Sequence, residues 1–297
     1  MIDIKLCDLC STSKFEFLYH IKHTKPDFKV VKCSNCGLIF QNPRFSDEEI
    51  KSFYSKDYYS GVADFSYIDE RENFIGSSFV WKKRINKMKK YIETDSEKKI
   101  LLDIGCSFGG FLFYAQKSGF EPYGIDISDY STEYAREKLN LKNIITGEFK
   151  KGIYDKNFFD AITMIEVIEH IKNPGQIINE VYNILKKGGL LVIQTANFDG
   201  LQAKIKGSKY HYFLPGHLFY FSKKTLTAYL KRAGFRKIKI FYGVDFGLLP
   251  KLLKSIHTFK KPLEYFRLFK ISFYHLKSQI HYKNFALTSS MVIYAIK

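Results

Sequence analysis

Short apolar runs alternate with segments of helical periodicity between residues 99 and 197. Five runs have the length and composition of buried strands, and they lie at residues 99–106, 121–128, 142–149, 160–167 and 190–197. Helical patterns separate them at residues 109–119, 131–140 and 175–189. One further helix and two further strands are predicted at residues 223–235, 236–243 and 287–297. Strands that alternate with helices indicate βαβ units and a parallel sheet, so we expect an α/β fold.

The segments around this pattern differ from it in composition. Short β-rich runs surround two Cys-x-x-Cys pairs near the N-terminus, and a mostly helical, basic stretch follows. Ser46 and Glu49 have the spacing of a capping box, which begins a helix. We expect a module at residues 1–45, a helical connector at 46–98 and a main domain at 99–297, with a loop-rich segment at 198–221 and a basic insertion at 248–283.

Composition is consistent with a large core and an intracellular location. Hydrophobic residues make up 45% of the 297 residues, enough for a sizeable core. The first residues, "MIDIKLCDLC", lack a signal-peptide pattern, and no apolar run is long enough to span a bilayer. Four of the five cysteines are paired by spacing, which argues against a secreted disulfide scaffold. We expect a cytoplasmic protein, with peripheral membrane contact as an alternative.

The net charge of +17 favours anionic partners such as nucleic acid, an anionic lipid surface or phosphorylated metabolites. Lysines that simply face solvent explain the same charge equally well, because net charge bears on association and not on fold.

Cys7, Cys10, Cys33 and Cys36 form two Cys-x-x-Cys pairs separated by 22 residues. Four thiolates can close a tetrahedral shell around Zn²⁺. The doubled spacing favours such a site over reduced pairs or a redox pair. A module this small lacks a large core, so the ion is expected to be structural, and four protein sulfurs leave no position for a substrate.

A glycine-rich turn, "LLDIGCSFGGFL", lies where the first predicted strand of the main domain meets its helix. Gly105 permits a ligand to approach the backbone, and Gly109 permits a tight helix entry. Asp126, at the end of the next strand, suits ribose hydroxyls. A pyrophosphate favours N–H groups at such a turn, whereas the carboxylate of Asp103 suits the ammonium and sulfonium of S-adenosylmethionine. Charge therefore favours S-adenosylmethionine over a dinucleotide.

The motifs "LLDIGCSFGGFL", "GIDIS", "ITGEF", "FDAITMIEVIEH" and "NILKKGGLLVIQTAN" together resemble the class I S-adenosylmethionine-dependent methyltransferases, over about residues 99–243 and the last strand. The paired cysteines and the following "NPRFSDEEI" resemble the subset with a zinc-ribbon-like head, many of which are similar to sugar and surface-polysaccharide methyltransferases. The resemblance implies a Rossmann-like sheet of seven strands, six parallel and the last antiparallel.

The same resemblance implies a set of cofactor contacts. For the methionine part of S-adenosylmethionine they are Asp103, Gly105, Cys106 and Gly109, and for the remainder Asp126, Ile127, Glu148, Phe149 and Ile165. Ser107 stands where the family more often has a second glycine, and its small size is expected to preserve binding.

Glu166, Glu169 and His170 follow the fourth strand of the main domain, at the edge where parallel sheets bind ligands. His170 is a candidate general base for a hydroxyl acceptor, with a glutamate orienting its ring. The three residues are also similar to the Mg²⁺-binding cluster of some quinone-pathway O-methyltransferases. In a third interpretation Glu166 flanks the cofactor and the other two begin a loop. We expect Glu166 at the cofactor edge and His170 in the chemistry.

The loop-rich segment carries "KYHYFLPGHLFYFS", in the place where this family builds its acceptor lid. His217 lies in a stretch that resembles the family's "P-x-H-L-x-x-F-S", and we expect a catalytic or acceptor-site role for it. His211 is expected to pack the lid on the core. The Cys106 side chain is expected to fill space and not to act as a nucleophile.

The insertion at 248–283 contains eight Lys and Arg residues and one carboxylate, Glu264, with apolar residues at helical spacing. The favoured interpretation is a helix pair that packs on its own domain or on a second subunit. The alternative is a basic amphipathic surface on an anionic membrane, which suits a lipid-linked glycan.

These features predict methyl transfer from S-adenosylmethionine to a small-molecule or glycan acceptor, with a sugar, as a nucleotide-sugar or surface polysaccharide, favoured. A lipid or quinone acceptor is the second hypothesis. RNA is the third, although the chain shows no RNA-binding signature beyond its charge. A binding module without activity is the remaining alternative, and the intact set of Asp103, Gly105 and Asp126 argues against it.

Overall fold

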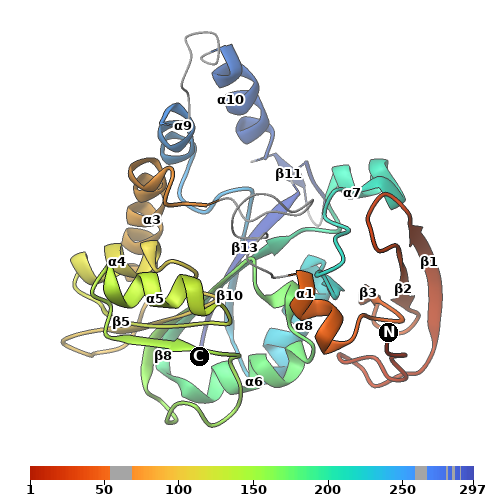
Figure 1. Cartoon of the computed structure of the whole chain (residues 1–297), viewed down its shortest axis with the longest axis horizontal. Coiled ribbons are helices and arrows are strands. Elements are labelled where there is room, and N and C mark those ends of the chain that lie inside the picture. Colours follow the sequence, from red (N-terminus) through yellow and green to blue (C-terminus); the bar gives the residue numbers. More distant parts are fainter. Residues whose placement is uncertain (54–68, 258–265, 279, 283–284, 288) are drawn as a thin grey trace.

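The main domain is built on one large sheet. The computed structural model describes residues 1–53, 69–257, 266–278, 280–282, 285–287 and 289–297 (Figure 1). Seven strands pair in the order β10-β13-β8-β7-β4-β5-β6. Their bounds are β4 (Ile100–Ile104), β5 (Glu121–Asp126), β6 (Asn143–Thr146), β7 (Phe159–Ile165), β8 (Leu185–Ala196), β10 (Lys237–Tyr242) and β13 (Ser290–Ile296). β13 is antiparallel to both neighbours and the pairs from β8 to β6 are parallel, which confirms the expected α/β fold.

Helices cover both faces of this sheet, because successive strand residues point to opposite sides. In β13, Met291 and Ile293 join the core on one face, while Val292 and Tyr294 join the core on the other. The first face is covered by α6 (Pro174–Ile184) and α8 (Lys223–Ala233), and the second by α3 (Phe74–Lys89), α4 (Gly110–Lys117) and α5 (Asp129–Glu137).

The N-terminal residues form a second sheet of antiparallel strands, in the order β1-β2-β3-β9. Three of them are β1 (Phe15–Ile21), β2 (Phe28–Cys33) and β3 (Ile39–Gln41). The fourth, β9 (Phe219–Tyr220), comes from the loop-rich segment of the main domain. The N-terminal module and this segment therefore share one sheet (Figure 1). Sequence reasoning missed the pairing, because a two-residue strand has no periodicity to detect.

Aromatic side chains fix the loop-rich segment, which also contains α7 (Leu201–Lys206), against the N-terminal module. Tyr210, Phe213 and Tyr220 are buried in one cluster with Phe28 and Phe45 of the module. Full burial of a large apolar side chain contributes roughly 1.5–3 kcal/mol, so the cluster holds the segment firmly against the N-terminal module.

The connector begins with α1 (Asp47–Phe53), and the predicted capping box forms its start. The Ser46 N–H donates to the Glu49 carboxylate at 2.7 Å, and the Glu49 N–H donates to Ser46 Oγ at 3.3 Å. The part of the connector at residues 54–68 lies outside the described residues.

The basic insertion contains α9 (Leu249–Ile256), α10 (Arg267–Ser278) and β11 (His281–Tyr282), and β11 forms a hairpin with β12 (Phe285–Ala286), which follows the insertion. Residues 258–265, 279 and 283 of the insertion lie outside the described part. α9 packs on α3, in agreement with the favoured interpretation, whereas α10 projects from the body of the molecule (Figure 1). Phe266, Phe269, Phe273 and Leu276 expose 77%, 83%, 58% and 60% of their surface. Within the described ranges, no helix has both the length and the apolar character that a bilayer span requires.

Candidate active site

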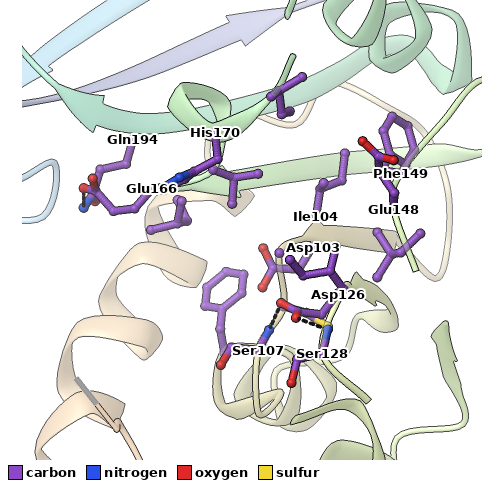
Figure 2. A pocket seen from close by; sticks show the side chains of 18 of the residues that line it. Asp103, Ile104, Ser107, Asp126, Ser128, Glu148, Phe149, Glu166, His170 and Gln194 are labelled. Atoms are coloured by element: carbon purple, nitrogen blue, oxygen red, sulfur yellow. Dashed lines mark hydrogen bonds between the residues drawn. The ribbon is translucent and has the colours of Figure 1, made fainter. Parts of the chain in front are cut away.

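A cleft of about 2290 Å³ opens where β4, β5 and β7 end. It exceeds the roughly 300–1,000 Å³ of a typical single-ligand pocket, so it has room for more than one small molecule. Of the residues predicted for the site, those that line it are Asp103, Gly105, Cys106, Asp126, Ile127, Glu148, Phe149, Ile165, Glu166, His170 and His217 (Figure 2). The structure does not place Gly109 on the wall of this cleft.

Asp103 is a buried carboxylate, with 5% of its surface exposed. The hydroxyl of Thr163, on the neighbouring strand β7, donates to Asp103 Oδ1 at 2.5 Å. Burial raises the pKa of Asp103 to about 7, while the bond from Thr163 lowers it. A cationic ligand group would offset the cost of burying this charge, so the site favours a positively charged ligand.

The turn after β4 requires small residues. Gly105 has φ +76°, and a Cβ there would lie 2.4 Å from Val167 Cγ2. Ser107 also has a positive φ, of 47°, and its N–H donates to the Asp126 carboxylate at 2.8 Å (Figure 2). The other Asp126 oxygen accepts from the Ser128 N–H at 3.0 Å. Asp126 thus fastens the turn to the end of β5, a role that sequence reasoning did not assign to it.

Gly109 and the Cys106 side chain serve packing. A Cβ on Gly109 would lie 2.9 Å from Ala135 Cβ of α5, so this glycine lets α4 begin close to α5. The Cys106 thiol packs beside Gly124 of β5, and burial raises its pKa well above the ordinary value. A thiol held in its neutral form agrees with a space-filling role.

Glu166 directly follows β7 and has a left-handed conformation, with φ 55°. Gln194 Nε2 donates to its carboxylate at 2.7 Å (Figure 2), and the Arg84 guanidinium donates to Gln194 Oε1 at 2.5 Å. Arg84 also pairs with the buried Asp245 at 3.0 Å. This network sets the direction of the Glu166 side chain. Nothing local predicts it, because its members come from α3, β8 and the segment after β10.

His170 and His217 meet edge to face at the wall of the cleft, with ring centroids 4.6 Å apart. His170 Nδ1 bonds the carbonyl of Gly216 at 2.9 Å, and His217 Nδ1 bonds that of Tyr212 at 2.8 Å. A carbonyl accepts only, so each Nδ1 carries the proton and each Nε2 the lone pair. Burial lowers the pKa of His170 to about 4 and that of His217 well below its ordinary value. Both rings are neutral at neutral pH, and a pKa near 4 makes His170 a weak proton acceptor.

Glu169 lies beside this pair with 2% of its surface exposed. Among the described residues, none donates a hydrogen bond of ordinary geometry to either carboxylate oxygen, although Glu166 and Thr195 lie near enough to influence the pKa. Burial raises the pKa of Glu169 well above its ordinary value. Ligand atoms of Glu169, His170 and His217 all lie within 4.8 Å of one another. The sequence grouped Glu166 with Glu169 and His170, whereas the structure puts His217 in that place.

Two lysines of α9, Lys251 and Lys254, also line the cleft. Burial lowers the pKa of Lys251 to about 8, and Lys254 pairs with Glu70 at 3.0 Å. Sequence reasoning expected this segment to pack on its own domain or on a second subunit, or else to face an anionic membrane, and it did not place these side chains in the cleft. Their helical periodicity gives no sign that one face turns toward a cleft.

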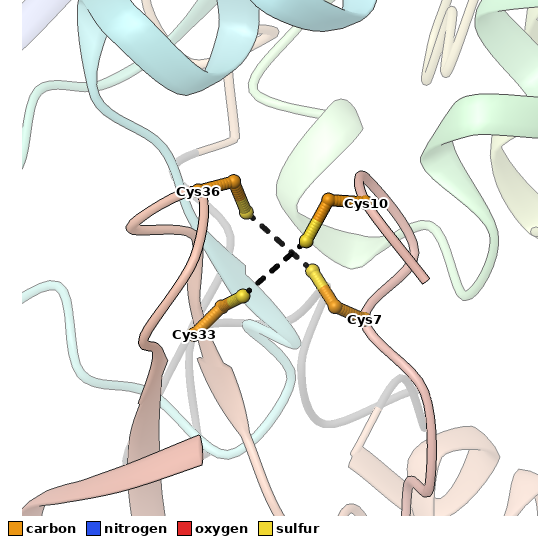
Figure 3. A group of neighbouring side chains, drawn as sticks. All are labelled: Cys7, Cys10, Cys33 and Cys36. Carbon is orange, nitrogen blue, oxygen red and sulfur yellow. Dashed lines mark hydrogen bonds between the residues drawn. The ribbon is translucent and has the colours of Figure 1, made fainter. Parts of the chain in front are cut away.

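The four paired cysteines converge at one point of the N-terminal module (Figure 3). The sulfurs of Cys7 and Cys36 lie 3.6 Å apart, and those of Cys10 and Cys33 lie 3.5 Å apart. Four sulfurs at about 2.3 Å from one ion stand about 3.8 Å from each other. The cluster thus fits a tetrahedral divalent ion.

The sequence model of a methyltransferase domain matches residues 79–240, more than half of the chain. A ubiquinone biosynthesis O-methyltransferase of Glaesserella parasuis is 39% identical over 109 residues, which cover 33% of this chain and 46% of that protein. A sterol 24-C-methyltransferase of Kluyveromyces lactis is 30% identical over 104 residues, which cover 33% of this chain and 28% of that protein. The matched regions thus span less than half of these relatives.

Solved structures share the fold. An S-adenosylmethionine-dependent methyltransferase from Archaeoglobus fulgidus aligns with a TM-score of 0.50 and 20% identity, over 76% of this chain and 97% of that one. The Haemonchus contortus phosphoethanolamine N-methyltransferase 2 in complex with S-adenosylmethionine aligns with a TM-score of 0.50 and 16% identity, over 87% of this chain and 61% of that one. From the family match, which the sheet and the cleft at its edge support, the chain belongs to the methyltransferase-domain family.

Proposed function

We propose that the protein transfers the methyl group of S-adenosylmethionine to a hydroxyl of a polar small molecule or glycan, with a sugar as the favoured acceptor. The support is a set of polar and charged side chains that line the cleft together with apolar ones: Glu70, Arg71, His170, Lys172, Gln194, Tyr212, His217, Lys251 and Lys254. A hydroxyl-rich, anionic acceptor such as a nucleotide-sugar can satisfy such groups. A large apolar ring would bury them without partners.

The cofactor residues keep the roles that the sequence suggests. Asp103 is proposed to hold the cationic methionine part, which the Gly105 turn lets approach the backbone. Asp126 is proposed to face the ribose, and Ile127, Glu148, Phe149 and Ile165 to surround the adenine. These side chains line one continuous cleft with the acceptor end, so the cofactor supplies its methyl group beside the acceptor.

His170 and His217 are proposed to activate the acceptor hydroxyl, and Glu166 to position the cofactor through its bond with Gln194. Both imidazoles lie on the cleft wall, between the end of β7 and the lid. They are therefore placed to act on an oxygen that attacks the methyl group.

Incubation with labelled S-adenosylmethionine and a panel of nucleotide-sugars, quinones and RNA tests the acceptor. Label is expected in the sugar fraction. Label only in the quinones or only in the RNA would contradict a sugar acceptor. Nucleic acid is not proposed as a partner of this protein.

Substitution of the imidazoles is expected to remove transfer and spare cofactor binding. His170→Asn and His217→Asn should each lower kcat by about 10²–10⁴-fold, the usual contribution of a group that activates a nucleophile. The affinity for S-adenosylmethionine should stay within a few-fold of wild type, because neither ring is near Asp103 or Asp126 in the proposed arrangement. His211→Asn is the matched control in the same lid. Equal losses of kcat in all three variants would show that the substitutions disturb the packing of the lid, and they would contradict a catalytic role for His170 and His217.

We also propose a structural Zn²⁺ ion on Cys7, Cys10, Cys33 and Cys36. The support is the convergence of four thiols at separations that suit one tetrahedral ion. The ion would hold β2 and β3 in place, and with them the lid strand β9.

A lipid-linked glycan or a lipid is the second candidate acceptor, and α10 favours it. Its exposed Phe269, Phe273 and Leu276 lie near the exposed Lys270, a combination that suits an anionic bilayer surface. The curated relatives named above for ubiquinone and sterol are consistent with this acceptor class. The wild-type protein should cosediment with vesicles that contain anionic lipid at low salt, and high salt should reduce this binding. The Phe269→Ser variant should not cosediment at low salt. No cosedimentation of wild type at low salt would remove the membrane proposal.

A further inference from the structure

We propose that Glu169, His170 and His217 bind a divalent transition-metal ion of the zinc class at the wall of the cleft, separate from the cysteine site. The proposal that an ion binds here rests only on the positions of these three side chains. Its role in methyl transfer rests on the proposed function.

The Glu169 carboxylate is the first support. It is almost fully buried, and the described residues offer it no hydrogen bond of ordinary geometry. A buried carboxylate without donors is costly unless a cation compensates it. The atoms nearest to it in this cluster are nitrogens of two neutral imidazoles, which cannot supply that charge by themselves.

The orientation of the imidazoles is the second support. The Nδ1–H of His170 donates to the Gly216 carbonyl, and the Nδ1–H of His217 donates to the Tyr212 carbonyl. The Nε2 atom of each ring therefore points away from these hydrogen bonds. Metal-binding histidines use their second nitrogen in this way, because the carbonyl fixes the tautomer and the ring direction. Carbonyls of the loop-rich segment 198–221 thus orient the same donor atom on both rings.

The backbone holds the ligands together before any ion binds. Glu169 and His170 follow β7, and His217 lies in the lid. The Leu218 N–H donates to the Glu169 carbonyl at 2.8 Å, which ties the two segments beside the cluster. Donor atoms within 4.8 Å need to approach about 3.4 Å to share one ion, a change that side-chain rotation provides.

The donor set selects the ion. Two imidazoles and one carboxylate suit Zn²⁺ and related ions, whereas Mg²⁺ prefers a shell of oxygen atoms. Three protein ligands leave at least one coordination position, and His170 and His217 both face the cleft. That position is therefore on the acceptor side, unlike the closed shell of the four cysteines.

An ion at this position explains how two weakly basic imidazoles serve methyl transfer. A hydroxyl that binds a Lewis acid loses its proton more readily. The proton passes to solvent, the acceptor oxygen forms the new C–O bond, and the S–CH₃ bond breaks to leave S-adenosylhomocysteine. Neither imidazole has to accept the proton.

Metal content after loading with Zn²⁺ and desalting tests the site directly. Wild type should retain about two ions per chain, and Glu169→Gln and His217→Gln about one each. His211→Gln, in the same lid, should retain two, and Cys10→Ser should retain the one at the cleft. A single ion in wild type that persists in Glu169→Gln would overturn the proposal.

Thermal unfolding gives a second readout with opposite signs. After chelation, Glu169→Gln should unfold at or above the temperature of wild type, because it replaces a buried acidic group whose oxygens have no hydrogen-bond partner among the described residues. After addition of Zn²⁺ the order should reverse. An identical response of both proteins to Zn²⁺ would contradict the site. If the protein binds one ion per chain and still transfers methyl groups at the full rate, this proposal is overturned and the proposed function stands. If it binds two ions per chain and transfers no methyl group, the proposed function is overturned and the metal site stands.

Discussion

Asp103→Asn is expected to weaken S-adenosylmethionine binding by about 30- to 1,000-fold, as for loss of one member of a buried charge pair. The substitution keeps the size of the side chain and an oxygen that can accept from Thr163. It removes only the negative charge that faces the cleft. Calorimetry measures the loss, and an Asn variant with wild-type affinity would show that Asp103 does not hold a cationic group.

The same carboxylate makes cofactor binding depend on pH. The pKa of Asp103 is about 7 in the free protein, so the carboxyl is protonated below that pH and ionised above it. A cationic ligand needs the ionised form. The affinity of wild type should therefore fall as the pH drops below about 7, by up to tenfold per unit, while Asp103→Asn stays flat.

Thr163→Val is the matched variant for this dependence. It deletes the hydroxyl whose hydrogen bond lowers the pKa of Asp103. The midpoint of the pH dependence should move upward. The neighbouring charges Asp126 and Arg84 shift the pKa of Asp103 in opposite directions and are unchanged by this variant. A wild-type affinity that is constant from about pH 5.5 to 7.5 would contradict the ionic role.

Cys10→Ser should release the ion of the N-terminal module and destabilise the whole lid. Structural zinc contributes about 10–16 kcal/mol to the folding of isolated zinc modules, far more than a single packing contact. The effect should spread, because β3 pairs with β9 and the lid aromatics pack on the module. We expect one ion fewer per chain, a lower unfolding temperature and loss of methyl transfer, with S-adenosylmethionine binding retained.

Cys106→Ser is the control, since Cys106 is buried beside the glycine turn and outside the cysteine cluster. It should leave the metal content unchanged. Loss of the same ion from Cys106→Ser, or full metal content in Cys10→Ser, would contradict a four-cysteine site.

The main sheet and the part of the cleft around Gly105 could be predicted because their signals are local. The turn after β4 needs Gly105 at a positive φ, and the carboxylates Asp103 and Asp126 lie close to the carboxyl ends of adjacent strands. Parallel strands bring their carboxyl ends to one edge, so strand order along the chain is enough to gather these residues.

The sequence predicted His170 and His217 as site residues, but it could not predict how they are grouped in the cleft, because distant contacts determine the grouping. His217 reaches Glu169 and His170 only because the lid folds back on the end of β7. Glu166 does not belong to that group, because its carboxylate accepts a hydrogen bond from Gln194. The buried Arg84, which pairs with Asp245, holds Gln194 in place. No spacing rule relates these residues.

At the boundary between α6 and β8, hydrogen bonds to distant segments override the local helical preference of the sequence. The helical pattern continues to residue 189, but α6 ends at Ile184 and β8 begins at Leu185. Gly188 has φ +78°, accepts from the Glu93 N–H at 2.9 Å and donates to the Lys297 carbonyl at 3.0 Å. Pairing with these remote segments extends the strand at the expense of the last helical turn.

The most direct test of the central claim is calorimetric titration of the purified chain with S-adenosylmethionine at pH 7.5. Binding at one site per chain is expected, and it should weaken strongly in Asp103→Asn. Absence of binding at millimolar S-adenosylmethionine would contradict the assignment of this cleft to the cofactor.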